Sequence, residues 1–394
     1  ITLAYVRYFL CLCIIFIVLQ SMKIKQSDMD IIYILEHADD LWLRFRWKDG
    51  IPICPYCHSS QKQYKCADCR YKCNCCNRRY SSRVKTIFQN SKLSIQKIVL
   101  AIYHVLSTEA VSAISIARFI GVSYDTGWLF MKRLQYATLQ ETAITGIVAL
   151  DEVYLGSQWR NKHWKKKLEI LHDYHIIPPE KERFTLSEAG QAIDAYKTPV
   201  LGGTDGTKVF LQCLQNQFTS TDIQDLMQQF VQEAKMIVTD DSSLYNFLSD
   251  NHEINCHSHK QYTSKNGYSS NSIEGVFSHF KRRFRYATVH CKDCYMQLYL
   301  NLFVAKWNIR NCTMEECFGS IFGYITTGKT CRVKDIKECT KQPSKKELIR
   351  DKQLKKKADI ERMQKYINDN QDFIKSIEVH GQTLYPQHNT SAKS

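Results

Sequence analysis

The chain has 394 residues, 44% of them hydrophobic, which predicts two or three domains with a sizeable buried core. Its formal net charge of +15 favours a polyanionic partner, most often nucleic acid, over a solvated basic surface without a partner. The cysteine count of 17 is odd, and nine of these cysteines lie before residue 80. Clustered CxxC pairs are typical of metal binding in a reducing compartment and argue against a disulfide-bonded secreted protein. We therefore expect an intracellular protein, nuclear if the source is eukaryotic and cytoplasmic otherwise.

Residues 1–49 are predicted to contain a hydrophobic segment followed by a helical lead-in. The run from Phe9 to Leu19 is apolar and follows Arg7, a pattern compatible with a signal peptide or a short membrane anchor. The uninterrupted run is short for a membrane span, and no small-residue cleavage site follows it. We therefore favour a start of translation at Met22 and expect no membrane partner.

Residues 50–85 are rich in cysteine and predict a zinc ribbon. Each CxxC pair places two thiolates on one tight turn, so two pairs can close a tetrahedral Zn²⁺ site. The expected ligands are Cys54, Cys57, Cys73 and Cys76. A competing pair, Cys66 with Cys69, stays open as an alternative, but Arg78–Ser81 follow the chosen second pair as the second hairpin of a ribbon would. The module is too small to fold on its own core, so we expect the zinc to be structural.

Residues 86–140 predict three helices that include a helix-turn-helix. Apolar residues recur at helical spacing from Ile98 to Val105, and a second helix is expected over Ser112–Ile120. Gly121 then makes a short turn, and Ser123 can cap a third helix. This unit docks in the major groove of DNA, although ordinary helix packing is the alternative interpretation. The residues expected to contact DNA are Tyr124, Lys132 and Arg133.

Residues 145–318 alternate apolar strands with helices, which is the pattern of an α/β domain. A polar, Lys-rich insertion at 160–197 separates the first two strands. Residues 319–394 become basic and then polar, which predicts a helical and disordered tail. The expected strands are Gly146–Leu150, Pro199–Gly202, Lys208–Leu214 and Lys235–Val238.

Three acidic residues stand where a metal site is expected. Asp151 and Asp240 each end an apolar run, so each lies at the end of a predicted strand, where ligand sites of α/β sheets gather. Glu274 precedes an amphipathic run, and Lys281 follows it by two helical turns on the same face. Three carboxylates suit two Mg²⁺ ions, which take hard oxygen ligands and assist the attacking and leaving oxygens of a phosphoryl transfer. Asp241 is the alternative to Asp240 as a ligand.

In their order along the chain, these blocks resemble DDE transposases with an N-terminal zinc ribbon, a family of ISXO-like bacterial insertion-sequence enzymes and eukaryotic Merlin transposases. The resemblance implies a ribonuclease-H-like catalytic core and a cut-and-paste reaction at terminal inverted repeats, with Mg²⁺ or Mn²⁺. It also implies that Asp151, Asp240 and Glu274 are metal ligands, and that Lys281 serves the same site. The blocks that carry the resemblance are Asp151–Gly156, Asn161–His163, Thr239–Asp240, Asn271–Ser278 and Trp307–Asn308, with Cys73–Cys76 and Gly121–Tyr124 upstream.

Several features depart from the family pattern. Cys66–Cys69 looks like an insertion in the ribbon, and Leu302 stands where the last helix of the family often has an acidic residue. Asn271 is an alternative third ligand near Glu274. The pair Cys291–Cys294 is expected to be buried or merely reduced rather than metal-binding.

The acidic set favours an active transposase that binds transposon ends and target DNA. We expect a homo-oligomer, because two ends must be brought together. Leu302, and a sequence that starts at Ile1 rather than Met, keep a second interpretation open, a catalytically inactive or domesticated copy that only binds DNA. A ribonuclease-H-type nuclease without strand transfer would share the metal site, but it has no evident need of both N-terminal modules.

Overall fold

The computed structural model describes most of the chain between residues 26 and 336. Both the apolar N-terminal segment with Met22 and the C-terminal residues 341–394 lie outside the described residues. No helix within the described residues is long and apolar enough to cross a membrane. The described ranges are 26–47, 50–138, 143–156, 162–173, 176–190, 197–214, 218–248, 251–255, 270–288, 291, 293–326, 331 and 334–336.

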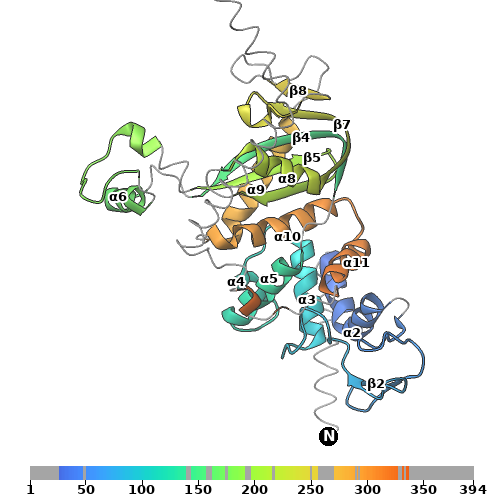
Figure 1. Cartoon of the computed structure of the whole chain (residues 1–394). Helices are drawn as coiled ribbons and strands as arrows, with labels where there is room; N and C mark the ends of the chain where they lie inside the picture. Colours follow the sequence, from blue (N-terminus) through green and yellow to red (C-terminus); the bar gives the residue numbers. More distant parts are fainter. Residues whose placement is uncertain are drawn as a thin grey trace, which may run out of the picture. The chain divides into compact units, whose positions relative to one another are not determined.

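A mixed sheet with the strand order β6-β5-β4-β7-β8 forms the centre of the α/β part (Figure 1). β4, β5 and β6 form an antiparallel meander, whereas β7 runs parallel to β4 on its other side and β8 runs parallel to β7. The four expected strands are confirmed, and β8 was missed because it is short and Ile254 is its one aliphatic residue. The strands are β4 (Ile144–Leu155), β5 (Thr198–Thr204), β6 (Val209–Cys213), β7 (Val231–Asp240) and β8 (His252–Asn255).

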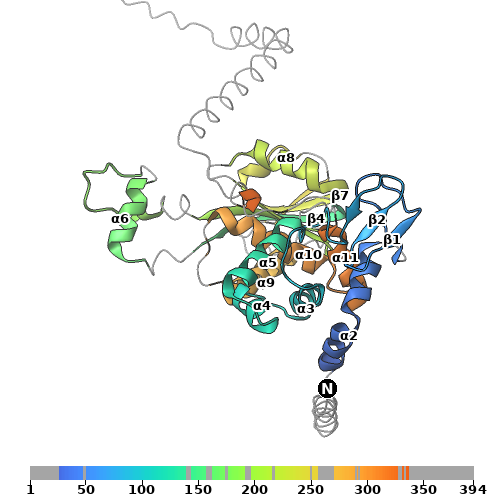
Figure 2. The same ribbon diagram turned by 90° about the horizontal axis from the view of Figure 1, so that it is seen from below.

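Helices cover both faces of this sheet, as Figure 2 shows. Successive side chains of a strand point to opposite faces. On β4, Ala149 and Val153 therefore pack under α9 (Asn271–Ala287) and α10 (Met296–Asn308). Val148 and Leu150 pack on the other face, against α8 (Ser220–Phe230).

The insertion between β4 and β5 has a small apolar cluster of its own. It contains α6 (Trp164–Asp173), and the buried residues Ile170, Leu171 and Ile177 make up its core. Lys165 and Lys166 at the start of α6 are exposed. The polar insertion expected from the sequence is therefore partly structured.

The helices predicted between residues 86 and 140 are present as α3 (Ile95–Ser107), α4 (Ala113–Phe119) and α5 (Tyr124–Ala137). Ser123 caps α5 as predicted, because its hydroxyl accepts a hydrogen bond from the N–H of Thr126. α4 and α5 approach each other very closely at Gly127. A Cβ atom placed there would lie 2.6 Å from the carbonyl oxygen of Ala113.

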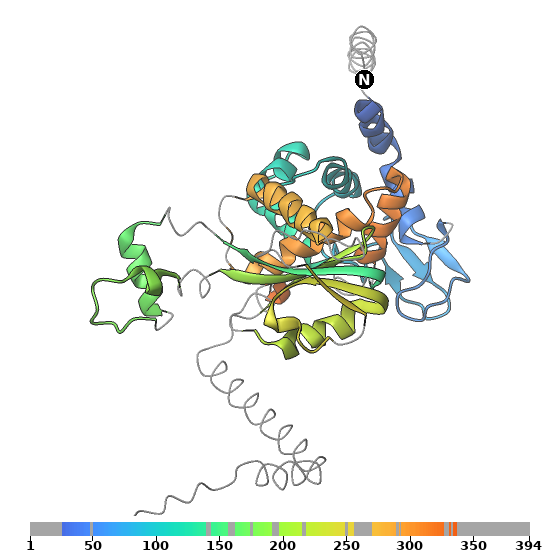
Figure 3. The same ribbon diagram turned by 90° about the horizontal axis from the view of Figure 1, so that it is seen from above.

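Two further helices join this helical group. α2 (Gln26–Arg46) and α11 (Met314–Ile325) lie side by side, in blue and dark orange in Figure 3, and Trp42 of α2 packs against Phe322 of α11 with ring centroids 5.3 Å apart. α10 contacts the group as well, through Leu298 and Leu302. The opposite side of α10, including Leu300, belongs to the core under the sheet. α10 is therefore shared by two cores.

The cysteine-rich module is a small antiparallel sheet that follows α2. Its strands are β1 (Gln63–Lys65), β2 (Tyr71–Cys73) and β3 (Arg79–Tyr80). Its apolar core is slight: Trp47, just after α2, packs edge-on against Tyr71, and the ring of Tyr71 stacks on Tyr80. So few apolar contacts agree with the expectation that the module needs a metal to fold.

Candidate metal centres

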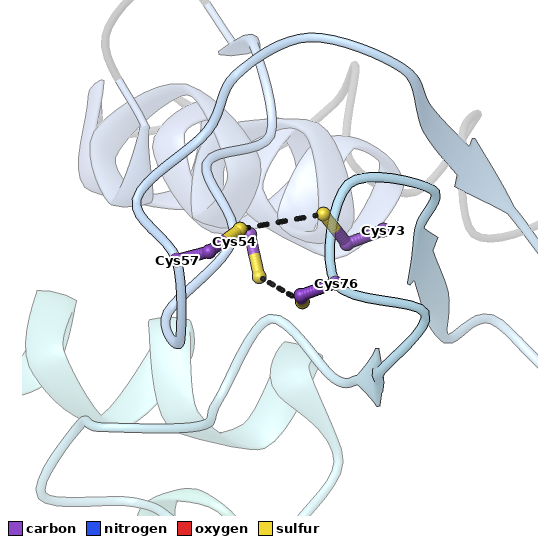
Figure 4. A group of neighbouring side chains, drawn as sticks. All are labelled: Cys54, Cys57, Cys73 and Cys76. Atoms are coloured by element: carbon purple, nitrogen blue, oxygen red, sulfur yellow. Dashed lines mark hydrogen bonds between the residues drawn. The ribbon is translucent and has the colours of Figure 1, made fainter.

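The four cysteines expected from the sequence come together in the cysteine-rich module (Figure 4). Their sulfur atoms all lie within 4.8 Å of one another, with Cys54 3.6 Å from Cys76 and Cys57 3.6 Å from Cys73. Four sulfurs at about 2.3 Å from a tetrahedral zinc ion would be about 3.8 Å apart. The thiolate set therefore fits a structural Zn²⁺.

Local backbone geometry explains why the competing cysteine pair is not part of this cluster. In both ligand pairs the N–H of the first cysteine donates to the carbonyl five residues later, Cys54 to Ser59 and Cys73 to Arg78. In each of these turns the residue after the second cysteine has a positive φ. In the turn of Cys66 and Cys69 the closing bond spans four residues, and Cys69 itself has φ 59°. This turn is an ordinary hairpin end that does not present two sulfurs in the same way.

A hydrogen-bonded chain supports one of the sulfurs. The amide nitrogen of Gln63 donates to the sulfur of Cys73 over 3.3 Å, and the hydroxyl of Tyr80 donates to the amide oxygen of Gln63 over 2.9 Å. Burial alone would raise the pKa of Cys73, but the hydrogen bonds from Gln63 and the backbone outweigh it and lower the pKa to about 6. Cys73 is thus held close to the thiolate form that metal binding requires.

A second cluster of possible ligands lies where β7 ends beside the second half of β4, which continues to Leu155. These strands are parallel neighbours in which Ala149 pairs with Val238, and each continues two residues further to an aspartate. Carboxylate oxygens of Asp151, Glu152 and Asp240 lie within 4.8 Å of one another. Three oxygen ligands this close fit a divalent cation such as Mg²⁺ or Mn²⁺.

Glu152 is the member of this cluster that the sequence did not single out. By strand alternation it lies on the face opposite to Asp151, where it accepts a hydrogen bond from Tyr245 of η3 (Ser243–Tyr245). Burial raises the pKa of Glu152 to about 7 against the effect of this hydrogen bond, and nearby Asp240 and Asp151 add to the rise. The apolar run of the sequence ends at Leu150, and the strand was predicted to end there. The sequence therefore did not indicate that β4 continues through Glu152 and that this side chain is partly buried.

Glu274 and Lys281, the other two residues expected at the site, are exposed on α9. Glu274 lies in the first turn of the helix and is not part of the cluster of acids within 4.8 Å. α9 does cover the face that bears Asp151, because Phe277 packs on Gly202, the cross-strand partner of Asp151. The structure therefore brings Asp151 and Asp240 together and leaves Glu274 on the helix above the same face.

A buried asparagine extends the row of acids. Asn255 ends β8 and pairs with Asp240, so their side chains share one face of the sheet. It is 0% exposed, and within the described residues neither polar atom of its amide has a hydrogen-bond partner. Sequence reasoning missed Asn255 because β8 carried no strand signal.

The three residues expected to contact DNA have different surroundings. Tyr124 at the start of α5 is 56% exposed. Arg133 is half-buried and donates to the carbonyl of Cys331 over 3.1 Å. Lys132 is only 2% exposed, and its ammonium group lies 4.0 Å from the ring centre of Tyr299 on α10. The expectation for Lys132 was therefore wrong, because this lysine packs between two helices and does not reach the surface.

Comparison with known proteins finds a family match for the α/β part of the chain. Residues 143–308 match the model of the ISXO2-like transposase domain. This part of the chain is therefore similar to ISXO2-like transposase domains, which confirms the resemblance noted in the sequence.

One relative and the solved structures complete the comparison. The chain is 28% identical over 123 residues to a protein in the transposable element ISH50 of Halobacterium salinarum, a match that covers 30% of this chain and 41% of that protein. The chain thus matches about two fifths of the length of this relative. No solved structure matches this chain.

Proposed function

We propose that the protein is a DNA transposase that cuts and joins DNA strands at the ends of a mobile element, using a metal site built on Asp151, Asp240 and Glu274. The observation that carries this proposal is the meeting of Asp151 and Asp240 on two neighbouring parallel strands, inside the segment that matches the ISXO2-like transposase domain. Two widely separated acids that converge in this way support a common chemical task.

The strand arrangement supports a ribonuclease-H-like core. Such a core has an antiparallel meander of three strands, with two further parallel strands beside the first of them, and this is the order of the mixed sheet. The proposed acids then lie on the first and fourth strands of the core and on the helix after the fifth. We infer that Glu274 joins the other two when DNA and metal are bound.

The chain's own residues have simple tasks in this mechanism. Mg²⁺ or Mn²⁺ would supply the activation of the attacking hydroxyl or water and the stabilisation of the leaving oxygen. Asp151, Asp240 and Glu274 would hold the ions at the edge of the sheet. Lys281, seven residues after Glu274 on the same helix, would contact a phosphate near the cut.

Two N-terminal modules would hold the DNA. Helices α4 and α5 with their short turn are compatible with a helix-turn-helix, and the exposed Tyr124 at the start of α5 is the residue we assign to the DNA contact. The zinc ribbon adds positive charge, since residues 50–85 contain eight Lys or Arg and the single acid Asp68. Because two transposon ends must meet, we expect the active form to be a homo-oligomer.

The test is a comparison of two neighbouring acids. Inverted repeats flanking the gene would supply the DNA substrate. Asp240→Asn should abolish Mg²⁺-dependent nicking of that DNA and leave binding in a gel-shift assay nearly intact. Asp241→Asn is the matched control and should nick normally. Wild-type nicking by the Asp240 variant would remove this residue from the site and contradict the proposal.

A further inference from the structure

The side-chain amide of Asn255 is an anomaly in the fold. It is completely buried, and its nitrogen and oxygen have no hydrogen-bond partner within the described part of the chain. Leaving a buried polar group unpaired lowers the stability of the fold relative to an apolar residue of the same shape. Native proteins keep such groups rarely, and a functional role is one of the few reasons. A leucine would fill this position at a lower energetic cost.

The position of Asn255 points to what the amide binds. It pairs with Asp240 across β7 and β8, and Asp240 lies beside Asp151 across β4 and β7. Ala149, two residues before Asp151 on the same face, packs in the core under α9. The three polar side chains therefore form one row across three adjacent strands, on the face that α9 covers.

We propose that Asn255 is a further metal-binding residue of the carboxylate site, and that its amide oxygen binds the divalent cation held by Asp240. An amide oxygen is a hard ligand of the kind that Mg²⁺ and Mn²⁺ accept. Because the amide is neutral, it adds a ligand without adding another negative charge beside Asp151 and Asp240. This inference rests on the proposed function, since it requires a cation at these acids.

The experiment measures metal binding rather than catalysis. The full-length chain, with zinc in its ribbon and without DNA, is titrated with Mn²⁺ and followed by calorimetry and by the electron paramagnetic resonance of free Mn²⁺. Asn255→Leu should weaken Mn²⁺ binding by about tenfold or more, a change of the size seen when groups that support metal ligands are lost. Asn255→Asp should retain Mn²⁺ binding, because it keeps an oxygen in the same place.

Stability provides a second measurement that separates a ligand from a structural residue. If the amide serves the metal, Asn255→Leu should unfold at a higher urea concentration than the wild type without added Mn²⁺, because the unpaired amide is gone. A structural role would give the opposite result, lower stability with unchanged Mn²⁺ affinity, and would overturn the inference. Asn246→Leu, the same change at an exposed position, is the control and should leave Mn²⁺ binding unchanged.

A third variant separates this inference from the proposed function. Asp240→Asn should weaken Mn²⁺ binding if the acids form a metal site. If the Asp240 variant loses affinity and Asn255→Leu does not, only the role of Asn255 is rejected. If neither variant changes Mn²⁺ affinity, the chain holds no such cation here, and both proposals are rejected.

Discussion

At the scale of single residues, the buried lysine of α5 is a charged side chain that packs between two helices. Lys132 lies over the rings of Tyr295 and Tyr299, and its ammonium group donates to the side chain of Gln135 over 2.8 Å. Burial lowers the pKa of Lys132 from its ordinary 10.5 to about 8, although the nearby Cys291 and Cys294 oppose the change. A lysine in this setting joins α5 to α10 through cation–π contacts.

The lowered pKa of Lys132 predicts a specific pH dependence of stability. Below about pH 8 the lysine is protonated in both the folded and the unfolded chain. Folding then buries a charged ammonium group, and the full cost of this burial lowers the free energy of unfolding. Between about pH 8 and 10.5 only the folded chain has lost the proton, so stability rises with pH. The free energy of unfolding of the wild type should therefore increase by about 2 kcal/mol relative to Lys132→Met between about pH 7 and pH 9.5.

Urea denaturation at several pH values checks this expectation. Lys165→Met, at an exposed position on α6, is the control and should follow the wild type at every pH. A constant difference between the wild type and the Lys132 variant over this range would contradict the pH dependence expected from burial.

The acidic site contains residues that could be predicted from the sequence and residues that could not. Asp151 and Asp240 were predictable because each follows an apolar run that is visible in the sequence, although only Asp240 ends its strand and β4 continues past Asp151 to Leu155. Glu152 and Asn255 were not, since their roles depend on which strands are neighbours and on which face is covered. Lys132 was misassigned for the same reason: its face of α5 is polar in the sequence but is covered by two tyrosines that lie more than 150 residues away.

At the scale of elements, the cysteine-rich module separates ligands from other cysteines. The sequence offered two possible second pairs and favoured Cys73 with Cys76, and both the positions of the sulfur atoms and the backbone of the turns agree with this choice. We predict that Cys73→Ser releases the zinc and unfolds the module, because the slight core around Trp47 and Tyr71 cannot hold it. Cys69→Ser should keep zinc at the wild-type level. Metal analysis of the purified variants provides the measurement, and zinc loss from the Cys69 variant would reverse the assignment.

The contact between α4 and α5 depends on one glycine. A Cβ atom at Gly127 would lie 2.8 Å from the Cβ of Ala117 and closer still to the backbone of α4. We therefore expect Gly127→Ala to lower the free energy of unfolding by about 1–3 kcal/mol, as overpacking does elsewhere. Gly323→Ala in α11 meets nothing within 4 Å and should instead stabilise the chain by about 0.5–1 kcal/mol. Denaturation curves that rank the two variants in the opposite order would refute this account of the contact.

At the scale of the whole molecule, α10 determines how the parts depend on one another. One side of it packs in the core under the sheet, and the other side packs with α3, α5 and α11. Lys306, near its end, donates to the carbonyls of Val105 and Thr108 at the end of α3. The boundary that sequence patterns suggested between the helical region and the α/β region is therefore not a boundary between independent cores.

A fragment experiment tests this dependence. Residues 143–308, the segment matched by the family model, would leave Leu298 and Leu302 of α10 uncovered. We expect this fragment to aggregate, or to unfold without the cooperative transition of the full chain, because a large apolar surface is exposed. Size-exclusion chromatography and urea denaturation give the result. A monodisperse fragment as stable as the full chain would show that the two cores are independent.

The double role of α10 also affects how such proteins can diverge. A helix with two buried sides accepts a change on one side only if the partner on that side changes with it. Recombination that exchanged the N-terminal half between two relatives would bring together packing surfaces that had not evolved together. Under the proposed function, new DNA preferences should therefore arise through gradual substitution at exposed positions such as Tyr124. Engineered chimaeras should keep α10 together with the helices that pack on it.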